Sequence, residues 1–427
     1  MNDLRKKENY ENMLMYGLIL MILLQLISTV AIIGAKGWGI APTDLRIYWQ
    51  GSAYYVRGIT LAEAEADPLP EIGLVHVNTI MPWARILGQL LYPGFLPLSI
   101  VTVWFWIFFC AALFVFFLQL RKWLSENCDI SDKTRLTVFT LGAMFITWFW
   151  WDVVIAANPG SLIAILGALA FFYVEKNPDL AALLLAFALC KPQIGAIFLL
   201  AFFLMKYYKV LVRCGVILAV SWVLGELYMI FIRNLRGLPP REARGGLEVV
   251  RGLFFERIRS GNAQMDDKVS YLYYGLFDPL RWAGVPLIAV ILLSAAAGVA
   301  YVIFCWLCLK KTGRKIDPVV MGAATAIASF FWAYKSLCDA VIIAMCNAFL
   351  IAVFLQDEKK DMKKLAMLFA GLVLMNCKVV KYFIRFPLGL PHTIGIAGDM
   401  VLQILVFTYY FMIYVNSIKE IKARENG

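Results

Sequence analysis

The chain has 427 residues, of which 62% are hydrophobic and 16% are charged, and its formal net charge is +11 at pH 7. Soluble domains carry roughly 25% charged residues, so this composition excludes an ordinary soluble globular protein. The basic residues lie mostly in short clusters beside apolar segments, as in cytoplasmic loops of membrane proteins. The positive charge therefore does not indicate nucleic-acid binding.

Apolar stretches recur along the chain at about the 20-residue length that crosses a hydrocarbon core of roughly 30 Å. Because a lipid environment requires backbone polar groups to be paired internally, stretches of this length predict an all-α polytopic membrane protein. No polar block is long enough to form a separate soluble domain, so we expect one integral-membrane domain over residues 1–427. The expected segments are 13–33, 95–119, 136–151, 161–175, 180–205, 210–232, 284–309, 317–334, 337–356, 364–382 and 395–416.

The segment 180–205 is the exception among these spans. A full crossing would place Lys206 and Lys209 outside, against the positive-inside rule. Pro192 interrupts the helix, and each half of about 11–13 residues, at ~1.5 Å per residue, covers only part of the bilayer. We therefore predict a re-entrant hairpin with Lys191 at its tip.

With this hairpin, the basic clusters predict ten crossings, two cytoplasmic termini and an outward-facing site in the cell membrane. The outer loops 34–94 and 234–283 then form a roof over the bundle. Each contains apolar residues at helical spacing, which predicts interfacial helices. These residues are Ile80, Trp83, Leu87 and Leu91 in the first loop and Val250, Phe254 and Ile258 in the second.

Polar residues near the outer ends of the spans are the candidate site residues. A charge at the bilayer centre costs about 2.5–3.5 kcal/mol on insertion scales, so each charge requires a partner or a purpose. The candidates are Asp44, Arg46, Tyr48, Lys191, Gln193, Asn262, Ser270, Tyr334, Lys335 and Asp339. Each also has a structural explanation: Asp44 can cap a helix, Lys191 can reach the headgroups, and Lys335 can neutralise Asp339.

Several kinds of chemistry have no sequence signature here. The chain has two histidines, His76 and His392, and neither a nucleotide-binding glycine loop nor a Cys/His cluster. We therefore expect no metal site, no Ser-His-Asp triad and no cofactor.

Short motifs in a fixed order resemble the GT-C superfamily of integral-membrane glycosyltransferases, and most of all glycosyltransferase family 87, the polyprenyl-phosphate-mannose-dependent transferases. The motifs are Asp44-x-x-x-Tyr48 with Gly51 and Gly58, Asn78-x-x-x-Pro82-Trp83, Asn158-Pro159-Gly160, Lys191-Pro192-Gln193, the run from Asn262 to Ser270, and Trp332-x-Tyr334-x-x-x-x-Asp339. The chain departs from the family at Ser161, where members often carry Gln, and in the Tyr-x-Pro-Pro run before the second span.

The resemblance implies a GT-C helical bundle that transfers a sugar, which would be mannose or another hexose. The donor would be a polyprenyl-phosphate sugar, and the acceptor would be a lipid or glycan at the outer membrane face. The configuration at the anomeric carbon would be inverted. Asp44 would be the general base. Basic residues would stabilise the departing phosphate, with Lys191 first, then Lys335 and the Arg251–Arg259 group, because fixed cations suit a water-poor site.

Three other functions fit parts of the same pattern. A flippase for a lipid-linked sugar would use the same cations without a positioned base. A glycan polymerase or ligase would use the arginines of the second outer loop on a lipid-diphosphate donor. A structural membrane protein would leave the charges of Asp44, Lys191 and Asp339 without a purpose.

Overall fold

The computed structural model describes residues 2–36, 43–73, 83, 85–147, 150–240, 273–274, 284–332, 335–377, 379–380, 384, 386–389 and 392–426. In this part the chain is helical apart from one pair of two-residue strands. The elements are α1 (Asn2–Lys36), α2 (Thr43–Val56), α3 (Leu61–Ala66), α4 (Arg85–Leu91), α5 (Leu98–Asn127), α6 (Lys133–Phe145), α7 (Trp150–Ala156), α8 (Pro159–Tyr173), α9 (Pro178–Ala188), α10 (Pro192–Leu204), α11 (Tyr208–Leu235), β1 (Tyr273–Tyr274), α15 (Leu287–Lys310), α16 (Pro318–Trp332), β2 (Lys335–Ser336), the 3-10 helix η4 (Leu337–Ile342), α17 (Ile343–Gln356), α18 (Met362–Asn376), α19 (Phe386–Leu388) and α20 (His392–Asn426).

Five helices in the described residues are long and apolar enough to cross a membrane, which suggests a multi-pass membrane protein. They correspond to Glu8–Ala35, Leu98–Asn127, Tyr208–Leu235, Ala289–Lys310 and Ala397–Arg424. Only 11–28% of each apolar window is buried within the protein. Their exposed faces carry large apolar side chains, as lipid-facing helices require.

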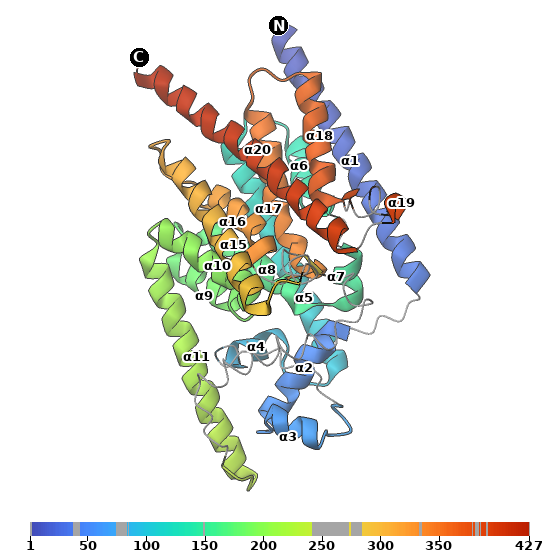
Figure 1. The fold of residues 1–427 in the computed structure, drawn as a ribbon, viewed down its shortest axis with the longest axis vertical. Helices are drawn as coiled ribbons and strands as arrows, with labels where there is room; N and C mark the ends of the chain where they lie inside the picture. The colour runs from blue at the N-terminus through green and yellow to red at the C-terminus, as the bar shows by residue number, and fades with distance from the viewer. Residues whose placement is uncertain are drawn as a thin grey trace.

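The other predicted segments are shorter helices that fill the interior (Figure 1). In α17 every residue from Ile343 to Leu355 is buried, and in α8 nearly the whole length is buried. Because they are apolar on all sides, these helices need the surrounding helices as cover. Their polar residues are paired: the amides of Asn347 and Asn376 exchange hydrogen bonds of 2.9 and 3.0 Å, which join α17 to α18.

Two predicted segments are interrupted. Segment 136–151 forms two helices, α6 and α7, rather than one continuous span. Segment 337–356 begins with the 3-10 helix η4, and only then continues as α17. Segment 364–382 is also shorter than expected, because α18 ends at Asn376. Apolar composition alone could not reveal these breaks, since neither Pro nor Gly marks them.

The predicted break at Lys191-Pro192 is present, and the chain reverses there. Helix α9 has 11 residues and α10 has 13, so each arm is about 16–20 Å long at ~1.5 Å per residue. The hydroxyl of Tyr207, which follows α10, donates to Glu175, which precedes α9. The two open ends of the hairpin therefore lie together, while its closed end contains Lys191.

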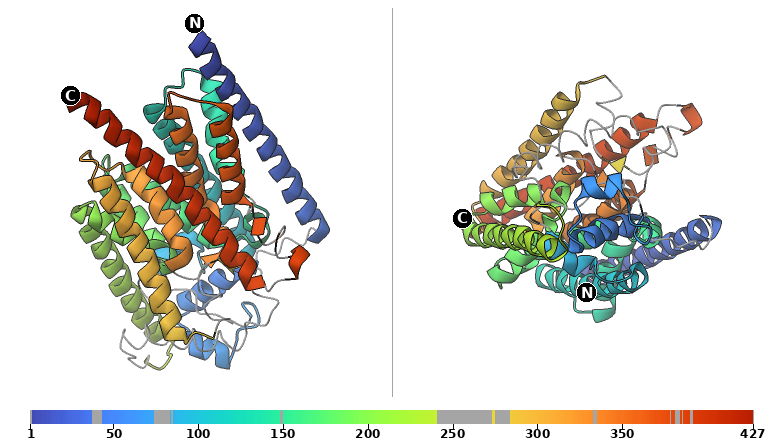
Figure 2. Two further views of the ribbon diagram at one scale, coloured as in Figure 1. Left: turned by 45° about the horizontal axis from the view of Figure 1, so that its top comes forward. Right: turned by 90° about the horizontal axis from the view of Figure 1, so that it is seen from below.

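The connections predicted as cytoplasmic meet at one end of the molecule, where both termini also lie (Figures 1 and 2). Ion pairs and hydrogen bonds join them in a chain of contacts. Arg135 pairs with Glu8 at 2.9 Å and Lys360 with Glu11 at 3.8 Å; Lys315 pairs with Glu175 at 2.9 Å, and Trp123 donates to Asp317 at 2.8 Å. We call this end the termini end.

At the opposite end, α2, α3 and α4 pack against the last turns of α11 (Figure 1). The Arg233 guanidinium, 3% exposed, donates to both carboxylate oxygens of Glu63 at 2.8 Å and to the carbonyls of Gly58 and Pro239. The hydrogen bonds from Arg233 lower the pKa of Glu63 to about 2, against the opposing effect of burial. This clamp fixes α3 and the end of α2 to α11.

Replacing Gly195 by Ala should destabilise the hairpin. A Cβ at Gly195 would lie 2.6 Å from the backbone of Ala188, and overpacking of this kind costs about 1–3 kcal/mol. Gly215→Ala in α11 is the matched control, because nothing lies within 4 Å of its added Cβ. Thermal unfolding in detergent would measure both variants. Equal midpoints would show that α9 and α10 do not approach this closely.

Stability should also fall in acid through the Glu63–Arg233 pair. The folded pKa of Glu63, about 2, lies below its ordinary 4.5, so the stabilisation is complete above about pH 4.5 and disappears as the pH falls towards 2. Glu63→Gln should lose about 1–3 kcal/mol at neutral pH and flatten the pH profile of the unfolding midpoint. Asp179→Asn, which breaks the exposed pair with Arg213, should change little. A Glu63→Gln protein with an unchanged acid profile would contradict the clamp.

Candidate functional site

The carboxylate of Asp44 is held by an amide from a distant helix. Asp44 lies in the first turn of α2, and its Oδ2 accepts a 2.6 Å hydrogen bond from Nδ2 of Asn158. Asn158 is the N-cap of α8: its Oδ1 accepts from the backbone N–H of Gly160 at 2.7 Å. One buried side chain therefore caps the start of α8 and holds the carboxylate of the predicted base.

The backbone beside this contact is strained. Ala157, which precedes Asn158 and is fully buried, has φ = +44°, a conformation that costs a non-glycine residue of the order of 1–3 kcal/mol. Such outliers concentrate at functional sites, where the surrounding structure maintains them. Here the strain aims the Asn158 side chain at α2.

Asp44, Tyr48 and Ser52 lie on one face of α2, because they are spaced four residues apart. Tyr48 is 9% exposed, and its ring packs on that of Tyr92 with centroids 5.4 Å apart. Ser52 is fully buried against the chain at Gly94. We call Asp44, Tyr48 and Ser52 the α2 face.

Arg46 does not share the α2 face. It is exposed, two residues beyond Asp44, and its guanidinium lies beside Gly73. Gln50, one turn further along, donates to the carbonyl of Ile72 at 2.8 Å. The structure therefore places the predicted Arg46 with the 72–73 segment and not beside Asp44.

The hairpin tip lies next to Trp83 of the 34–94 segment. Lys191 is 7% exposed and occupies the N-cap position of α10, with Gln193 in the first turn. The indole of Trp83 donates to the carbonyl of Leu189 at 3.1 Å. A buried cation is thus placed at the N-terminus of α10, where the helix dipole is positive. These two positive features favour an anion.

The remaining predicted residues belong to segments 234–283 and 334–339. Asn262, Ser270 and Tyr334 lie outside the described residues. Lys335 lies in β2 and Asp339 in η4, and their side chains lie outside the described part. β2 pairs antiparallel with β1, so that Lys335 is opposite Tyr274. η4 packs against α7 and α8, so Asp339 belongs to an element that contacts the helix capped by Asn158.

Several buried polar residues were not among the predicted site residues. Asn158, Ser52 and Tyr92 border Asp44 or Tyr48. Asp399 of α20 is 2% exposed and accepts a 2.7 Å hydrogen bond from the backbone of Val380. The Asn-Pro-Gly run gives a signal for Asn158, because Asn is a favoured N-cap and Pro a favoured first helical residue. The other three have no local sequence signal.

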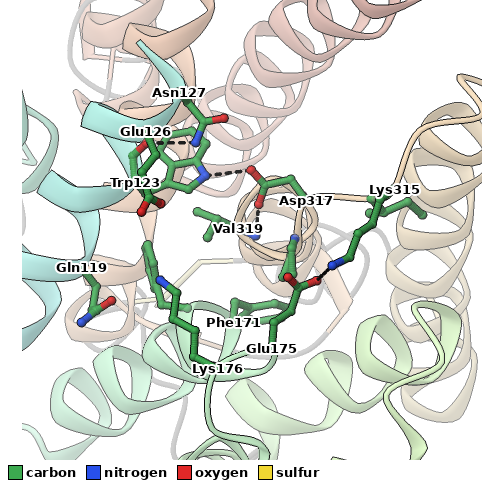
Figure 3. A pocket seen from close by; sticks show the side chains of 13 residues that line it. Gln119, Trp123, Glu126, Asn127, Phe171, Glu175, Lys176, Lys315, Asp317 and Val319 are labelled. Atoms are coloured by element: carbon green, nitrogen blue, oxygen red, sulfur yellow. Dashed lines mark hydrogen bonds and ion pairs between the residues drawn. The ribbon is translucent and has the colours of Figure 1, made fainter. Parts of the chain in front are cut away.

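A cavity of about 240 Å³, whose lining side chains Figure 3 shows, lies at the termini end. Its lining includes Trp123, Glu175, Lys315 and Asp317. Trp123 and the backbone N–H of Val319 donate hydrogen bonds to Asp317. Glu175 is at the far end of α8 from Asn158, about 20 Å away along a 15-residue helix. This cavity is therefore separate from the Asp44 site.

In the described part of the chain, no group of three or more His, Cys, Asp or Glu side chains is arranged to hold a metal ion. Comparison with protein-family models, with curated proteins and with solved structures gives no match to this chain. The candidate site consists of the α2 face, Asn158 and the hairpin tip.

Exchanging Asn158 for Asp should test the contact with Asp44. Asp and Asn cap helices equally well, so α8 keeps its cap, but a second carboxylate then faces Asp44. Two carboxylates this close cannot both ionise cheaply. The Asn158→Asp protein should be destabilised by about 1–3 kcal/mol at pH 7 and recover as the pH falls towards about 4, where one carboxyl is protonated.

Asn158→Ser is the matched control, since it keeps a capping oxygen and adds no charge. Its loss of stability should not depend on pH in this range. Thermal unfolding between pH 4 and 7 measures both. A deficit of Asn158→Asp that is the same at every pH would mean that the two side chains do not touch.

Proposed function

We propose that this protein is an integral-membrane glycosyltransferase that moves a hexose from a polyprenyl-phosphate donor to a lipid or glycan acceptor at the outer membrane face. The observation that carries the proposal is the hydrogen bond of 2.6 Å from Asn158 to Asp44. A carboxylate that only caps α2 has no need of an amide from a strained turn on another helix. A base must be oriented in this way.

The distribution of the charged groups supports a site that faces the outside of the membrane. Basic connections and both termini share the termini end, which the positive-inside rule assigns to the cytoplasm. Asp44, Trp83 and the tip of the hairpin then lie towards the outer side. The proposed topology is a GT-C-type bundle with ten crossings and one re-entrant hairpin. The outer loops 34–94 and 234–283 lie over the site.

In the proposed reaction, the Asp44 carboxylate takes the proton from a hydroxyl of the acceptor. At the same time the oxygen of that hydroxyl attacks the anomeric carbon of the sugar. The bond from that carbon to the phosphate oxygen breaks, with inversion, and polyprenyl phosphate leaves with one more negative charge. Lys191 and the N-terminus of α10 stabilise this charge, and burial strengthens the interaction. Mannose as the hexose rests on the family resemblance alone, as do Asn262, Ser270, Tyr334, Lys335 and Asp339 as further contacts.

Asp44→Asn should lower sugar transfer by about 10²–10⁴-fold, because the amide keeps the shape of the side chain and cannot accept the proton. Right-side-out and inverted membrane vesicles, each supplied with a panel of labelled polyprenyl-phosphate sugars, measure transfer and its sidedness. Asp67→Asn, an exposed change at the same end, is the matched control and should transfer normally.

Equal transfer by wild type and a normally folded Asp44→Asn protein would refute Asp44 as the base. Movement of the labelled lipid between leaflets without transfer, unaffected by Asp44→Asn, would instead identify a flippase. Transfer that requires a lipid-diphosphate donor would indicate a polymerase or ligase.

A further inference from the structure

Two hydroxyls next to the proposed site are buried without a hydrogen-bond partner in the described structure. They are Oγ of Ser52 and Oη of Tyr92, and both residues are 0% exposed. Burying an unpaired hydroxyl costs about 1–3 kcal/mol, and native proteins pair the large majority of such groups. Two of them in one region require an explanation.

Both hydroxyls belong to segments that border the proposed site. Ser52 belongs to the α2 face, two helical turns after Asp44. Tyr92 packs on Tyr48 of the same face, and Cys190, immediately before Lys191, lies near the Tyr92 phenol. Tyr92 therefore joins the α2 face to the tip that carries Lys191.

Three neighbouring tyrosines, by contrast, have paired hydroxyls. Tyr54, equally buried, donates to the carbonyl of Gly73 and accepts from the N–H of Leu69, both at 2.9 Å. Tyr55 donates to Gly225 at 2.7 Å, and Tyr228 to Val56 at 2.8 Å. Phenylalanine would supply the packing of Tyr92 without the cost of its hydroxyl.

The chemistry of the two groups suits an anionic acceptor. Burial raises the pKa of Tyr92 well above its usual value, so the phenol is protonated at neutral pH and can donate. A serine hydroxyl also donates, whereas phosphate oxygens only accept. Hydrogen bonds to a charged acceptor are about twice as strong as neutral ones.

We propose that Tyr92 and Ser52 are substrate-binding residues that donate hydrogen bonds to the phosphate of the lipid-linked sugar, between Asp44 and Lys191. This inference rests on the proposed function. The ring of Tyr48 covers Tyr92 and turns aside as the phosphate enters, a rotamer change of the kind common at binding sites. The unpaired hydroxyls are thus prepared for a ligand at the expense of stability.

Tyr92→Phe removes only the hydroxyl, so its effect on protein stability can be distinguished from its effect on lipid binding. Its unfolding midpoint should equal or exceed that of the wild type, because an unpaired buried group is lost. Its affinity for a short-chain polyprenyl monophosphate, measured by calorimetry in detergent, should fall about 10- to 100-fold, the loss of a hydrogen bond to a charged group. Ser52→Ala should act in the same direction.

Tyr301→Phe is the matched control. Its hydroxyl is paired with Thr408 at 2.8 Å, so this variant should unfold at a lower temperature and bind the lipid normally. Wild-type binding together with unchanged affinity in Tyr92→Phe and Ser52→Ala would refute this inference and leave the proposed function intact. No binding of the lipid monophosphate by the wild type would refute both.

Discussion

The structure depends on one constraint, the length of its interior helices. A helix of 11 to 15 residues is too short to cross a bilayer, so its end must lie within the protein. The first four N–H groups of such a helix have no partner of their own and require one nearby. Asn158 meets this need for α8, and α10 begins at Lys191. Short helices therefore bring polar, positively polarised ends into an otherwise apolar interior.

The same constraint explains how a charged residue can lie beside those ends. The carboxylate of Asp44 is directed towards the start of α8, where the helix dipole and the Asn158 amide both favour negative charge. Helix α2 is held in place from the other side by α11, through Tyr55, Tyr228 and the Arg233 clamp. Its orientation is thus fixed at both ends, by a long peripheral helix and by a short central one.

The sequence predicted the helices well because apolar length is a direct physical signal. The break at Lys191 was also predictable, since proline and the distribution of lysines both indicated it. The interruption between α6 and α7, in contrast, has no proline or glycine to mark it. At the site, Asp44 and Lys191 could be proposed from the cost of their charge, but Asn158, Ser52 and Tyr92 acquire their significance only from contacts between segments far apart in the chain. Nothing in a local pattern records that Tyr92 lies against Tyr48.

Several departures from local rules lie near the proposed site. Ala157 has a left-handed backbone, Lys191 is a buried lysine, and the hydroxyls of Ser52 and Tyr92 lack partners in the described structure. Each departure costs free energy, whereas the amides of Asn347 and Asn376 satisfy each other. Proteins tend to break local structural rules at functional sites, where a bound ligand can supply the partner that a buried polar group lacks. A phosphate would accept from both hydroxyls and pair with the lysine, whereas a purely structural role for this region would favour Phe and Ala at the two hydroxyl positions.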